Sequence, residues 1–343
     1  MQHVAIDLGG KESQICVRSS DGSVIEECRK PTAALGRYLE RQPRSRVVIE
    51  TCAEGFATAD LAIRLGHEVR VVPAALVRAL GVGARGLKND QRDARALSEA
   101  SCRLDLPSVH VPSIHSRQRK SMCGLRQVLV EARTKLINSV RGYLRTCCQR
   151  IHGRSSESFA RRVREHFASE QSELPAMVER QLKAIECLTE QIQEADRALA
   201  KQALADPVCK RLMTAPGVGP VTSVRFVATL DEVGRFSDAH AVASYLGLVP
   251  GERSSSDKQR RTGLTKAGPA QMRWLLMQAA WSVMRSRGEP PLKRWALEVS
   301  KRRGKHIATV ALARKLSGIL FALWRDGSEF QAVRAARWPS ASA

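Results

Sequence analysis

The chain has 343 residues and a net charge of +22, since 56 lysines and arginines outnumber 34 aspartates and glutamates. A surplus of this size repels itself unless a polyanion or a membrane surface neutralises it, and nucleic acid is the first candidate because each neutralised phosphate releases a counterion. Aromatic residues make up only 4% of the chain, which argues against base stacking as the main way of holding single strands.

The first hundred residues alternate strands with helices. The apolar runs predict strands at residues 3–9, 14–18, 23–28, 46–50 and 67–73, and helices at 32–41 and 57–65. The second and third strands can pair with the first as a hairpin across Ser20-Asp21-Gly22. This order predicts an α/β domain with a mixed sheet, which we assign to residues 1–110.

Long helices follow this domain. The pattern predicts a helix of about thirty residues from Ser116, with apolar side chains at Leu125, Val128, Leu129, Ala132, Leu136 and Val140. A second long helix follows Pro175, and its heptad seam is Ile185, Leu188, Ile192, Ala195 and Leu199. We expect a helical or coiled-coil arm at residues 111–206, either as two antiparallel helices, as a dimer contact or as part of an intramolecular bundle.

The C-terminal domain, residues 207–335, is expected to be mainly helical. Its first segment, Ala215-Pro216-Gly217-Val218-Gly219-Pro220, is either a helix-hairpin-helix turn that approaches a DNA phosphate or a plain turn between helices. Residues 246–268 read as a loop with short extended pieces, followed by helices at 271–286 and 307–324. Residues 251–343 contain 19 basic and 6 acidic side chains, a net charge of +13, so we expect this part to lie against phosphate, the alternative being a solvated arginine-rich surface.

The cysteine pattern, the N-terminal residues and the apolar segments predict the cellular compartment of the protein. The nine cysteines form no Cys-x-x-Cys pair and no zinc-type grid, which indicates small core residues in a reducing compartment. The chain opens directly on a strand, so no signal peptide is expected. The apolar stretch at 307–324 contains Arg314 and Lys315 and is therefore predicted to be an amphipathic helix. We expect a cytoplasmic, nucleoid-associated protein with no membrane partner.

Four carboxylates stand where the predicted elements converge. Asp7 and Glu50 each follow a buried strand, and such strand ends meet at one edge of a sheet. Asp90 and Asp93 are three residues apart and share one face of a helix. Four carboxylates gathered together resist ionising, and Mg²⁺ or Mn²⁺ relieves this because hard cations prefer oxygen ligands. Two such ions activate the nucleophile and stabilise the leaving oxygen of a phosphodiester.

Each carboxylate alone is weak evidence. An Asp at a strand end is often a cap, Asp-x-x-Asp is often a charged helix face, and Asp7-Leu8-Gly9 also matches the first phosphate loop of actin-like kinases. The order AIDLG, VIET, KNDQRDA within ninety residues carries more weight. Beside the last pair, Lys88 and Arg92 are expected to meet the phosphate.

This ensemble resembles the RuvC-like, RNase H-fold domain of the insertion-sequence 110 (DEDD) transposase family, which includes the Piv DNA invertases. The strand Gly66-His67-Glu68-Val69 looks like the family's GHEV strand, LKNDQRDARALSEA is similar to its KNDxxDAxAIAEA block, and the long central helices match in position. The resemblance implies that Asp7, Glu50, Asp90 and Asp93 are the metal-binding tetrad.

A serine-rich segment carries the second half of the resemblance. Ser254-Ser255-Ser256 is followed by basic residues, and cations around a hydroxyl favour its attack on phosphorus. From composition alone, a flexible loop is the simpler interpretation. However, LGLVP…SSSDKQRRTGLTKAG is similar to the family's GLxP…SSGGKQRxGxISKxGNxxLR motif, and the alignment places Ser255 on the family's nucleophilic serine, with Ser254 the nearest alternative. The expected nucleic-acid contacts of this part are Arg253, Lys258, Arg260, Arg261, Lys266 and Arg273.

These features predict a DNA transposase or site-specific recombinase that exchanges strands through a phosphoserine intermediate. The resemblance implies a homo-oligomer, a dimer or tetramer whose tetrad and serine come from different subunits, and in some members an element-encoded guide RNA. The closest rival is a RuvC-like nuclease or junction resolvase that uses activated water. Two others are an actin-like kinase, whose second phosphate loop and Gly-Gly adenosine motif are missing from the sequence, and a catalytically inactive DNA-binding protein.

Overall fold

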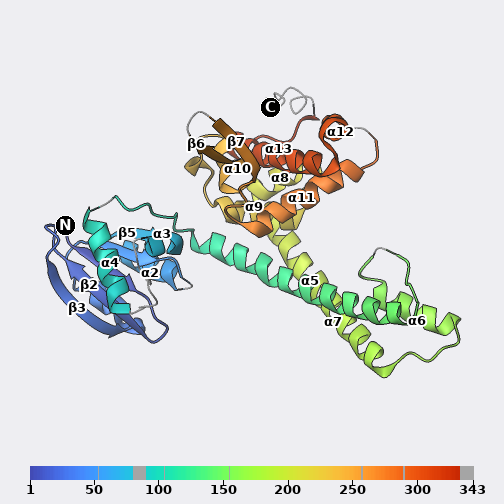
Figure 1. The fold of residues 1–343 in the computed structure, drawn as a ribbon, viewed down its shortest axis with the longest axis horizontal. Coiled ribbons are helices and arrows are strands. Elements are labelled where there is room, and N and C mark those ends of the chain that lie inside the picture. The colour runs from blue at the N-terminus through green and yellow to red at the C-terminus, as the bar shows by residue number, and fades with distance from the viewer. Residues whose placement is uncertain are drawn as a thin grey trace. The chain divides into compact units, whose positions relative to one another are not determined.

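The chain divides into two compact units, Met1–Pro112 and Ser113–Ala343 (Figure 1). We describe them from a computed structural model for residues 1–52, 54–79, 90–103, 105–153, 155–255, 258–288 and 290–332, with the backbone alone for 78, 79, 253–255 and 258–261. Each unit has its own hydrophobic core and is described separately.

A five-stranded mixed sheet forms the centre of the first unit. Its strands are β1 (His3–Asp7), β2 (Glu12–Arg18), β3 (Val24–Pro31), β4 (Arg46–Glu50) and β5 (Glu68–Val72). The spatial order is β3-β2-β1-β4-β5. The first three strands pair antiparallel, whereas β4 is parallel to both β1 and β5. The mixed sheet and the early hairpin expected from the sequence are therefore confirmed.

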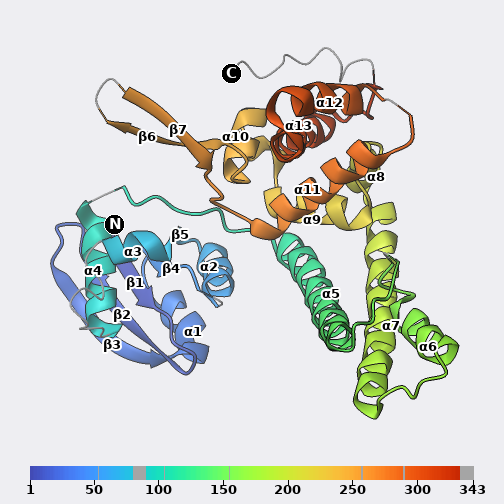
Figure 2. The ribbon, with the colours of Figure 1, turned by 45° about the vertical axis from the view of Figure 1, so that its right-hand side comes forward.

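Helices cover both faces of this sheet (Figure 2). They are η1 (Thr32–Ala34), α1 (Leu35–Glu40), α2 (Gly55–Arg64), α3 (Ala74–Ala79) and α4 (Asp90–Arg103). Val4 and Ile6 pack with residues of α1 and α2, whereas Ala5 packs with residues of α3 and α4. Val48 in β4 also lies on the α4 face. This alternation is the period of two expected for a strand buried on both faces.

Two long antiparallel helices begin the second unit, and a shorter helix packs near their end (Figure 2). They are α5 (Ile114–Thr146) and α7 (Ala176–Ala205), with α6 (Phe159–Ser169) between them in the chain. Arg126 of α5 contacts Asp196 at 2.8 Å and Arg133 contacts Thr189 at 3.3 Å, so residue numbers rise along one helix as they fall along the other. The long helices expected from the sequence are confirmed.

The buried faces of these helices differ in part from the expectation. On α7, Ile185, Ile192 and Leu199 are buried as predicted, whereas Leu188 and Ala195 are only half-buried. On α5, Leu125 is 69% exposed and Val128 is 61% exposed, so these two positions of the apolar spacing lie outside the buried stripe of the helix. Helical spacing identifies an apolar stripe, but it does not say which of two adjacent stripes the partner helix covers. On α5 the covered stripe is Cys123, Arg133, Ile137, Val140 and Leu144.

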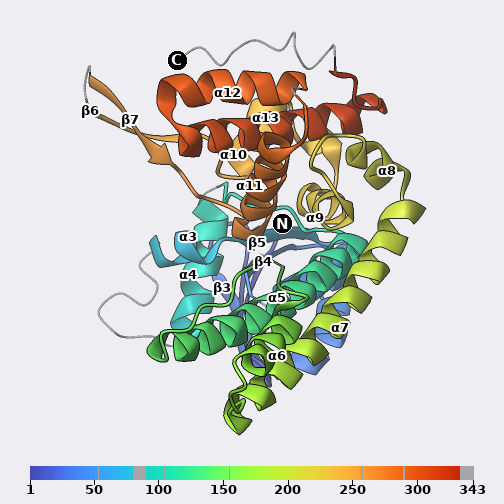
Figure 3. The ribbon, with the colours of Figure 1, turned by 90° about the vertical axis from the view of Figure 1, so that its right-hand side faces the viewer.

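The rest of the second unit is mainly helical (Figure 3). Its helices are α8 (Pro207–Met213), α9 (Pro220–Leu230), η3 (Val233–Arg235), α10 (Ala239–Tyr245), α11 (Ala270–Arg285), α12 (Pro291–Arg303) and α13 (Lys305–Asp326). By length and composition α13 could cross a membrane, but 61% of its most apolar window is buried inside the protein. Leu312, Leu316 and Leu320 are fully buried in the core of this unit, which is how the central helix of a globular domain behaves.

The segment expected to be mostly loop forms an antiparallel hairpin instead. Its strands are β6 (Pro250–Ser255) and β7 (Lys258–Leu264), with a register shift between Pro250 and Glu252. A two-stranded ribbon that is not part of a larger sheet needs no apolar alternation, so a run of serines and arginines gives no strand signal.

The breaker-rich turn between α8 and α9 packs against α11. Gly217 has φ +77°, and a Cβ atom there would lie 2.5 Å from the carbonyl oxygen of Ala279. The turn therefore needs glycine for its backbone conformation and for its close approach to a neighbouring helix. Of the two interpretations, this contact favours the plain turn between helices.

Candidate active site

Asp7 and Glu50 end adjacent parallel strands on the same face of the sheet. Ile6 is paired with Ile49 in the β1–β4 register, so the next residue on each strand is one of the two carboxylates. Ala5 and Val48 both face α4, and side chains two positions apart lie on the same face. The two carboxylates predicted from strand ends therefore lie side by side, on the side of the sheet that α4 covers.

The direction of α4 brings its first turn to this end of the sheet. His3 at the start of β1 contacts Ser101 near the end of α4, with 2.7 Å between Nδ1 and Oγ. One turn earlier, Ser98 accepts a hydrogen bond from Arg18 Nε at 2.9 Å. The helix thus runs antiparallel to β1, and its N-terminal turn lies at the end where β1 finishes.

That N-terminal turn carries the other two predicted carboxylates. Asp93 is only 7% exposed, and it shares a helical stripe with Leu97 and Ala100, which pack on the sheet. Asp90 is exposed and lies 3.8 Å from the guanidinium of Arg29. Arg29 is paired with Gln14, which in turn is paired with Asp7, so Asp90 lies at the same level of the sheet as Asp7.

An acidic residue on β3 holds α4 in this position. Glu27 accepts a hydrogen bond from Gln91 at 3.0 Å and a second, charge-assisted one from Arg95. The Arg95 guanidinium holds the pKa of Glu27 at about 2, well below the usual range of a carboxyl group. Sequence reasoning missed Glu27, Arg29 and Arg95, because side chains that join a strand to a helix some 65 residues away leave no local pattern.

The four carboxylates fit a divalent cation by donor type, since all are hard oxygen ligands. In the described part of the chain, however, no three His, Cys, Asp or Glu side chains are gathered closely enough to hold an ion. Asp90 is paired with Arg29 at the sheet edge, so it has to leave this arginine to join a common ion with the other three. Arg92 is exposed on α4, and Lys88 lies outside the described residues.

The serine segment lies at the tip of the β6–β7 hairpin. Ser255 is paired with Lys258, Ser254 with Gln259, and Arg253 with Arg260. Residues 256 and 257 lie outside the described residues, and of Arg261 only the backbone, in β7, is described. The register places both candidate serines beside the predicted basic residues, and it puts Ser255 in the last pair of the ribbon.

Two further predicted contact residues lie where the hairpin returns to the helices. Lys266 has a left-handed backbone conformation, with φ +53°. Arg273 of α11 donates from Nη1 to the carbonyl oxygens of Leu246 at 3.2 Å and Gly268 at 3.0 Å. These bonds give Arg273 a structural role at the base of the hairpin, and its contact with nucleic acid stays a prediction.

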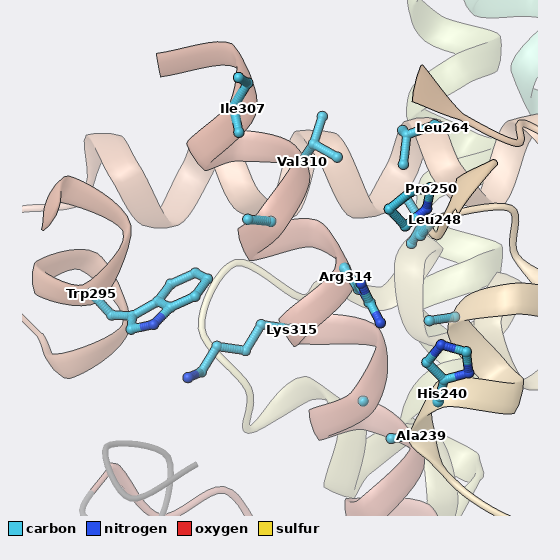
Figure 4. A pocket seen from close by; sticks show the side chains of 13 residues that line it. Ala239, His240, Leu248, Pro250, Leu264, Trp295, Ile307, Val310, Arg314 and Lys315 are labelled. Carbon is cyan, nitrogen blue, oxygen red and sulfur yellow. The ribbon is translucent and has the colours of Figure 1, made fainter. Parts of the chain in front are cut away.

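An apolar pocket of about 340 Å³ lies at the root of the hairpin, between α10, α12 and α13 (Figure 4). Pro250 and Leu264, the first pair of the ribbon, line it together with Trp295 of α12. The ammonium group of Lys315 lies 4.5 Å from the centre of the Trp295 ring, and burial lowers the pKa of this lysine. The pocket therefore lies directly against the first pair of the ribbon.

Comparison with known protein families covers both candidate regions. A model of the DEDD transposases of IS110 type matches residues 4–149, and one described as "Transposase IS116/IS110/IS902 family" matches residues 209–295. The two matches occur in this order and together cover about two thirds of the chain. The chain belongs to the IS110 family of insertion-sequence transposases.

Relatives match along nearly the whole length. A probable family 20 transposase of Pseudomonas aeruginosa is 28% identical over 94% of this chain and 96% of its own length. The transposase for insertion sequence element IS1328 of Yersinia enterocolitica is 28% identical over 95% and 98%, and that for IS1111A of Coxiella burnetii is 26% identical over 93% and 88%. Transposases of the IS110 family cut and rejoin DNA, so this chain is an enzyme that acts on DNA. The DEDD family is typically metal-dependent.

Proposed function

We propose that this transposase exchanges DNA strands through a phosphoserine link at Ser255, and that Asp7, Glu50, Asp90 and Asp93 hold the divalent cation that the reaction needs, Mg²⁺ or Mn²⁺. The observation that carries the proposal is the position of Asp7 and Glu50 at one end and one face of the sheet, beneath the N-terminal turn of α4. The matches to both family models support it, because one includes the tetrad and the other includes Ser255.

In the proposed mechanism Asp7, Glu50, Asp90 and Asp93 would hold the cation, which when bound would supply Lewis-acid polarisation of the scissile phosphate and stabilisation of the leaving oxygen. Ser255 Oγ attacks phosphorus, the bond to the 3′-oxygen breaks, and the serine proton passes to that oxygen. The 5′ side of the cut is now a phosphoserine ester. The 3′-hydroxyl of a second strand then attacks the same phosphorus and displaces Ser255 as a hydroxyl. The number of phosphoester bonds is conserved, so no nucleotide hydrolysis is needed.

The hairpin register supports Ser255 over Ser254. Directly opposed residues of an antiparallel ribbon belong to the same face. Ser255 is paired with Lys258. Two residues further from the tip of the hairpin, Arg253 is paired with Arg260. Ser254 opposes the uncharged Gln259. The register therefore pairs Ser255, and not Ser254, with a basic residue, which suits a nucleophile that has to meet a phosphate.

The same proposal assigns the other parts of the chain. Residues 1–110 hold the metal, 111–206 form the coiled-coil arm, and 207–335 carry the serine and the nucleic-acid surface of Arg253, Lys258, Arg260, Arg261, Lys266 and Arg273, with Lys88 and Arg92 beside the tetrad. The chain acts as a dimer or tetramer on element ends and target DNA, in the bacterial cytoplasm, and a guide RNA selects the site. Co-purified RNA, and loss of target choice after RNase treatment, are the expected observations. The kinship with Piv invertases stays a prediction.

Capture of a covalent protein–DNA adduct tests the nucleophile. The full chain is mixed with labelled element-end DNA and Mg²⁺, quenched with detergent, and resolved by denaturing electrophoresis. The adduct is expected with the unaltered chain and with Ser254→Ala, and it should vanish with Ser255→Ala. Strand joining by Ser255→Ala would overturn the serine mechanism and favour activated water, as in a RuvC-like nuclease.

A metal titration tests the tetrad separately. Mn²⁺ binding by calorimetry is expected to weaken strongly in Asp7→Asn and in Asp93→Asn, since each substitution removes a charged ligand. Asp60→Asn, on α2 at the opposite face of the sheet, is the matched control. Equal Mn²⁺ binding by all of these chains would exclude the tetrad as the metal site.

A further inference from the structure

A basic pocket lies at the far end of the α5–α7 pair, where α5 ends. Its volume is about 460 Å³, and its basic lining residues are Arg141, Arg145, Arg150 and His152. Leu144 and Ile151 form its apolar part. We propose that this arm-tip pocket binds a sugar-phosphate unit of a nucleic-acid backbone, as a second nucleic-acid site separate from the serine hairpin.

The shape of the arm-tip pocket follows from how α5 ends. Cys148 has a left-handed conformation, with φ +57°, and the amide of Gln149 donates to the carbonyl of Leu144 at 2.8 Å. This turn reverses the chain, so Arg150 and His152 return alongside the last two turns of the helix. The backbone turn therefore brings the lining residues on both sides of the pocket together.

The far wall of the loop is held by Arg162 of α6. This guanidinium donates to the carbonyl of Ser155 at 2.7 Å and also to the hydroxyl of Ser158. Gly153 has φ +114°, and a Cβ atom there would lie 2.8 Å from Arg162 Nε. The loop thus packs closely on α6, which keeps Ile151 and His152 in place.

The charges of the arm-tip pocket are not neutralised nearby. Within the described ranges, no acidic side chain pairs with Arg145 or Arg150, and both are exposed. The neighbouring acids have other partners, since Glu157 accepts from Ser155 at 2.6 Å and Glu165 pairs with Arg161 at 2.6 Å. The lining of the pocket contains three guanidinium groups and one imidazole, and it contains no carboxylate. This is the composition of an anion site.

Two competing explanations are weaker than phosphate binding. The C-terminus of α5 contributes a negative end equivalent to roughly half a charge, which three arginines outweigh. The arginines could instead cap the last carbonyls of α5, but in the described part of the chain neither Arg145 nor Arg150 donates to one. The side chain of Arg141 lies 5.3 Å from the centre of the Phe159 ring, which orients its guanidinium beside the pocket.

The size and position of the arm-tip pocket indicate a polymer as the ligand. A cavity of 460 Å³ holds more than a bare phosphate. Of the eight basic residues of helix α5, Arg119 and Arg126 form ion pairs with Asp206 and Asp196, whereas Lys120 on the same helix is exposed. Lys120, whose carbonyl binds Arg225 of α9 at 2.8 Å, is about 38 Å from Arg145 at 1.5 Å rise per residue. The distance between Lys120 and Arg145 is slightly more than one turn of a DNA duplex. A duplex of more than one turn is therefore long enough to contact both residues.

A matched pair of double variants tests the proposal. Arg145→Gln with Arg150→Gln removes two charges from the arm-tip pocket, and Arg180→Gln with Arg197→Gln removes two exposed charges from α7 outside it. Affinity for a labelled 30-base-pair DNA duplex, and for an RNA duplex of the same sequence, is measured by anisotropy between 50 and 300 mM salt. Both double variants are made in the Ser255→Ala chain, so the measured affinity does not depend on the serine chemistry.

The pocket variant should lower the salt slope of log Kd by about 0.9 for each lost phosphate contact, whereas the α7 variant should change it little. If the salt slope of log Kd falls with only the DNA duplex or only the RNA duplex, that result identifies the polymer that the pocket binds. Equal effects of the two variants on both duplexes would overturn the proposal. Unchanged helical circular dichroism and Tm establish that the variants fold.

The exposed cysteines beside the pocket provide an independent readout. Cys147 and Cys148 adjoin the lining residues, and Cys187 is exposed on α7. Bound nucleic acid should slow alkylation of the first two thiols by N-ethylmaleimide, read by mass spectrometry, and leave Cys187 unchanged. Alkylation of all three at the same rate with and without duplex would also contradict the proposal.

Discussion

The imidazole of His3 and the hydroxyl of Ser101 lie 2.7 Å apart, which joins the first residue of β1 to the last turn of α4. Both side chains are buried. This contact places the C-terminal end of α4 at the start of β1, and accordingly Asp90 and Asp93 lie at the end of the sheet that carries Asp7. Ninety-eight residues separate the two partners, so the contact depends on the fold as a whole.

The first prediction concerns the pH dependence of this contact. Burial above all, and then the charge of Arg46, lower the pKa of His3 below its ordinary value of 6.5. As pH falls below 6.5, the unfolded chain takes up a proton that the folded chain resists, so folding stability is lost until pH reaches the lowered pKa. Hydrogen exchange of β1 and α4 peptides should increase between pH 7.5 and 5.5 more in the unaltered chain than in His3→Gln.

The unaltered chain and the variants are compared at the same pH, which cancels the intrinsic pH dependence of hydrogen exchange. His115→Gln, an exposed position on α5, serves as the control and should follow the unaltered chain. If His3→Gln shows the same pH response as the control, His3 does not carry the effect.

The second prediction concerns Glu27. The pKa of this carboxyl is about 2 in the folded chain, chiefly because of its hydrogen bonds with Arg95, against about 4.3 when unperturbed. A depressed carboxyl pKa stabilises the fold above the unfolded value, and this stabilisation is lost as pH falls from about 4.3 toward 2. The urea midpoint of the first unit should therefore depend less on acid in Glu27→Gln than in the unaltered chain. Glu40→Gln, at an exposed position of the same unit, should leave the acid response intact.

The third prediction concerns Arg29, whose guanidinium lies 3.8 Å from Asp90 and 3.4 Å from Glu12. In the proposed metal site Arg29 would compete with the cation for Asp90, so Arg29→Ala is expected to bind Mn²⁺ more tightly. Both Arg29 and Asp90 are 59% exposed, and such a pair is worth up to about 1 kcal/mol, which converts to a decrease in Kd of up to about fivefold. Lys30→Ala removes the neighbouring charge as a control. Weaker Mn²⁺ binding by Arg29→Ala would mean that the arginine supports the site.

Parts of this site followed from the sequence for local reasons. Asp7 and Glu50 end apolar runs, and parallel strands put such ends at one edge, so their proximity was predictable. Residues spaced three apart on a helix predicted a common face for Asp90 and Asp93. The direction of α4 was not predictable, because it rests on long-range contacts such as those of His3 with Ser101 and of Glu27 with Arg95.

The errors have physical causes of the same kind. Leu125 has the spacing of a core residue on α5 but belongs to the stripe that α7 does not cover. The β6–β7 hairpin was expected to be mostly loop because an isolated ribbon has no buried face to impose apolar alternation. In both places the tertiary partner decides the outcome, and a single sequence does not contain it.

The last prediction decides between the two interpretations of the turn before α9. Gly217 has φ +77°, and a Cβ atom there would lie 2.5 Å from the backbone oxygen of Ala279, whereas a Cβ at Gly219 would meet nothing within 4 Å. Gly217→Ala should therefore cost roughly 2 kcal/mol or more through backbone strain and displacement of α11, and lower Tm by about 4–8 °C at 2–4 °C per kcal/mol. Gly219→Ala should cost less than about 1 kcal/mol. If instead both variants keep their Tm and lose DNA affinity, the turn contacts phosphate as a helix-hairpin-helix element does, and the packing against α11 is not the reason for its glycines.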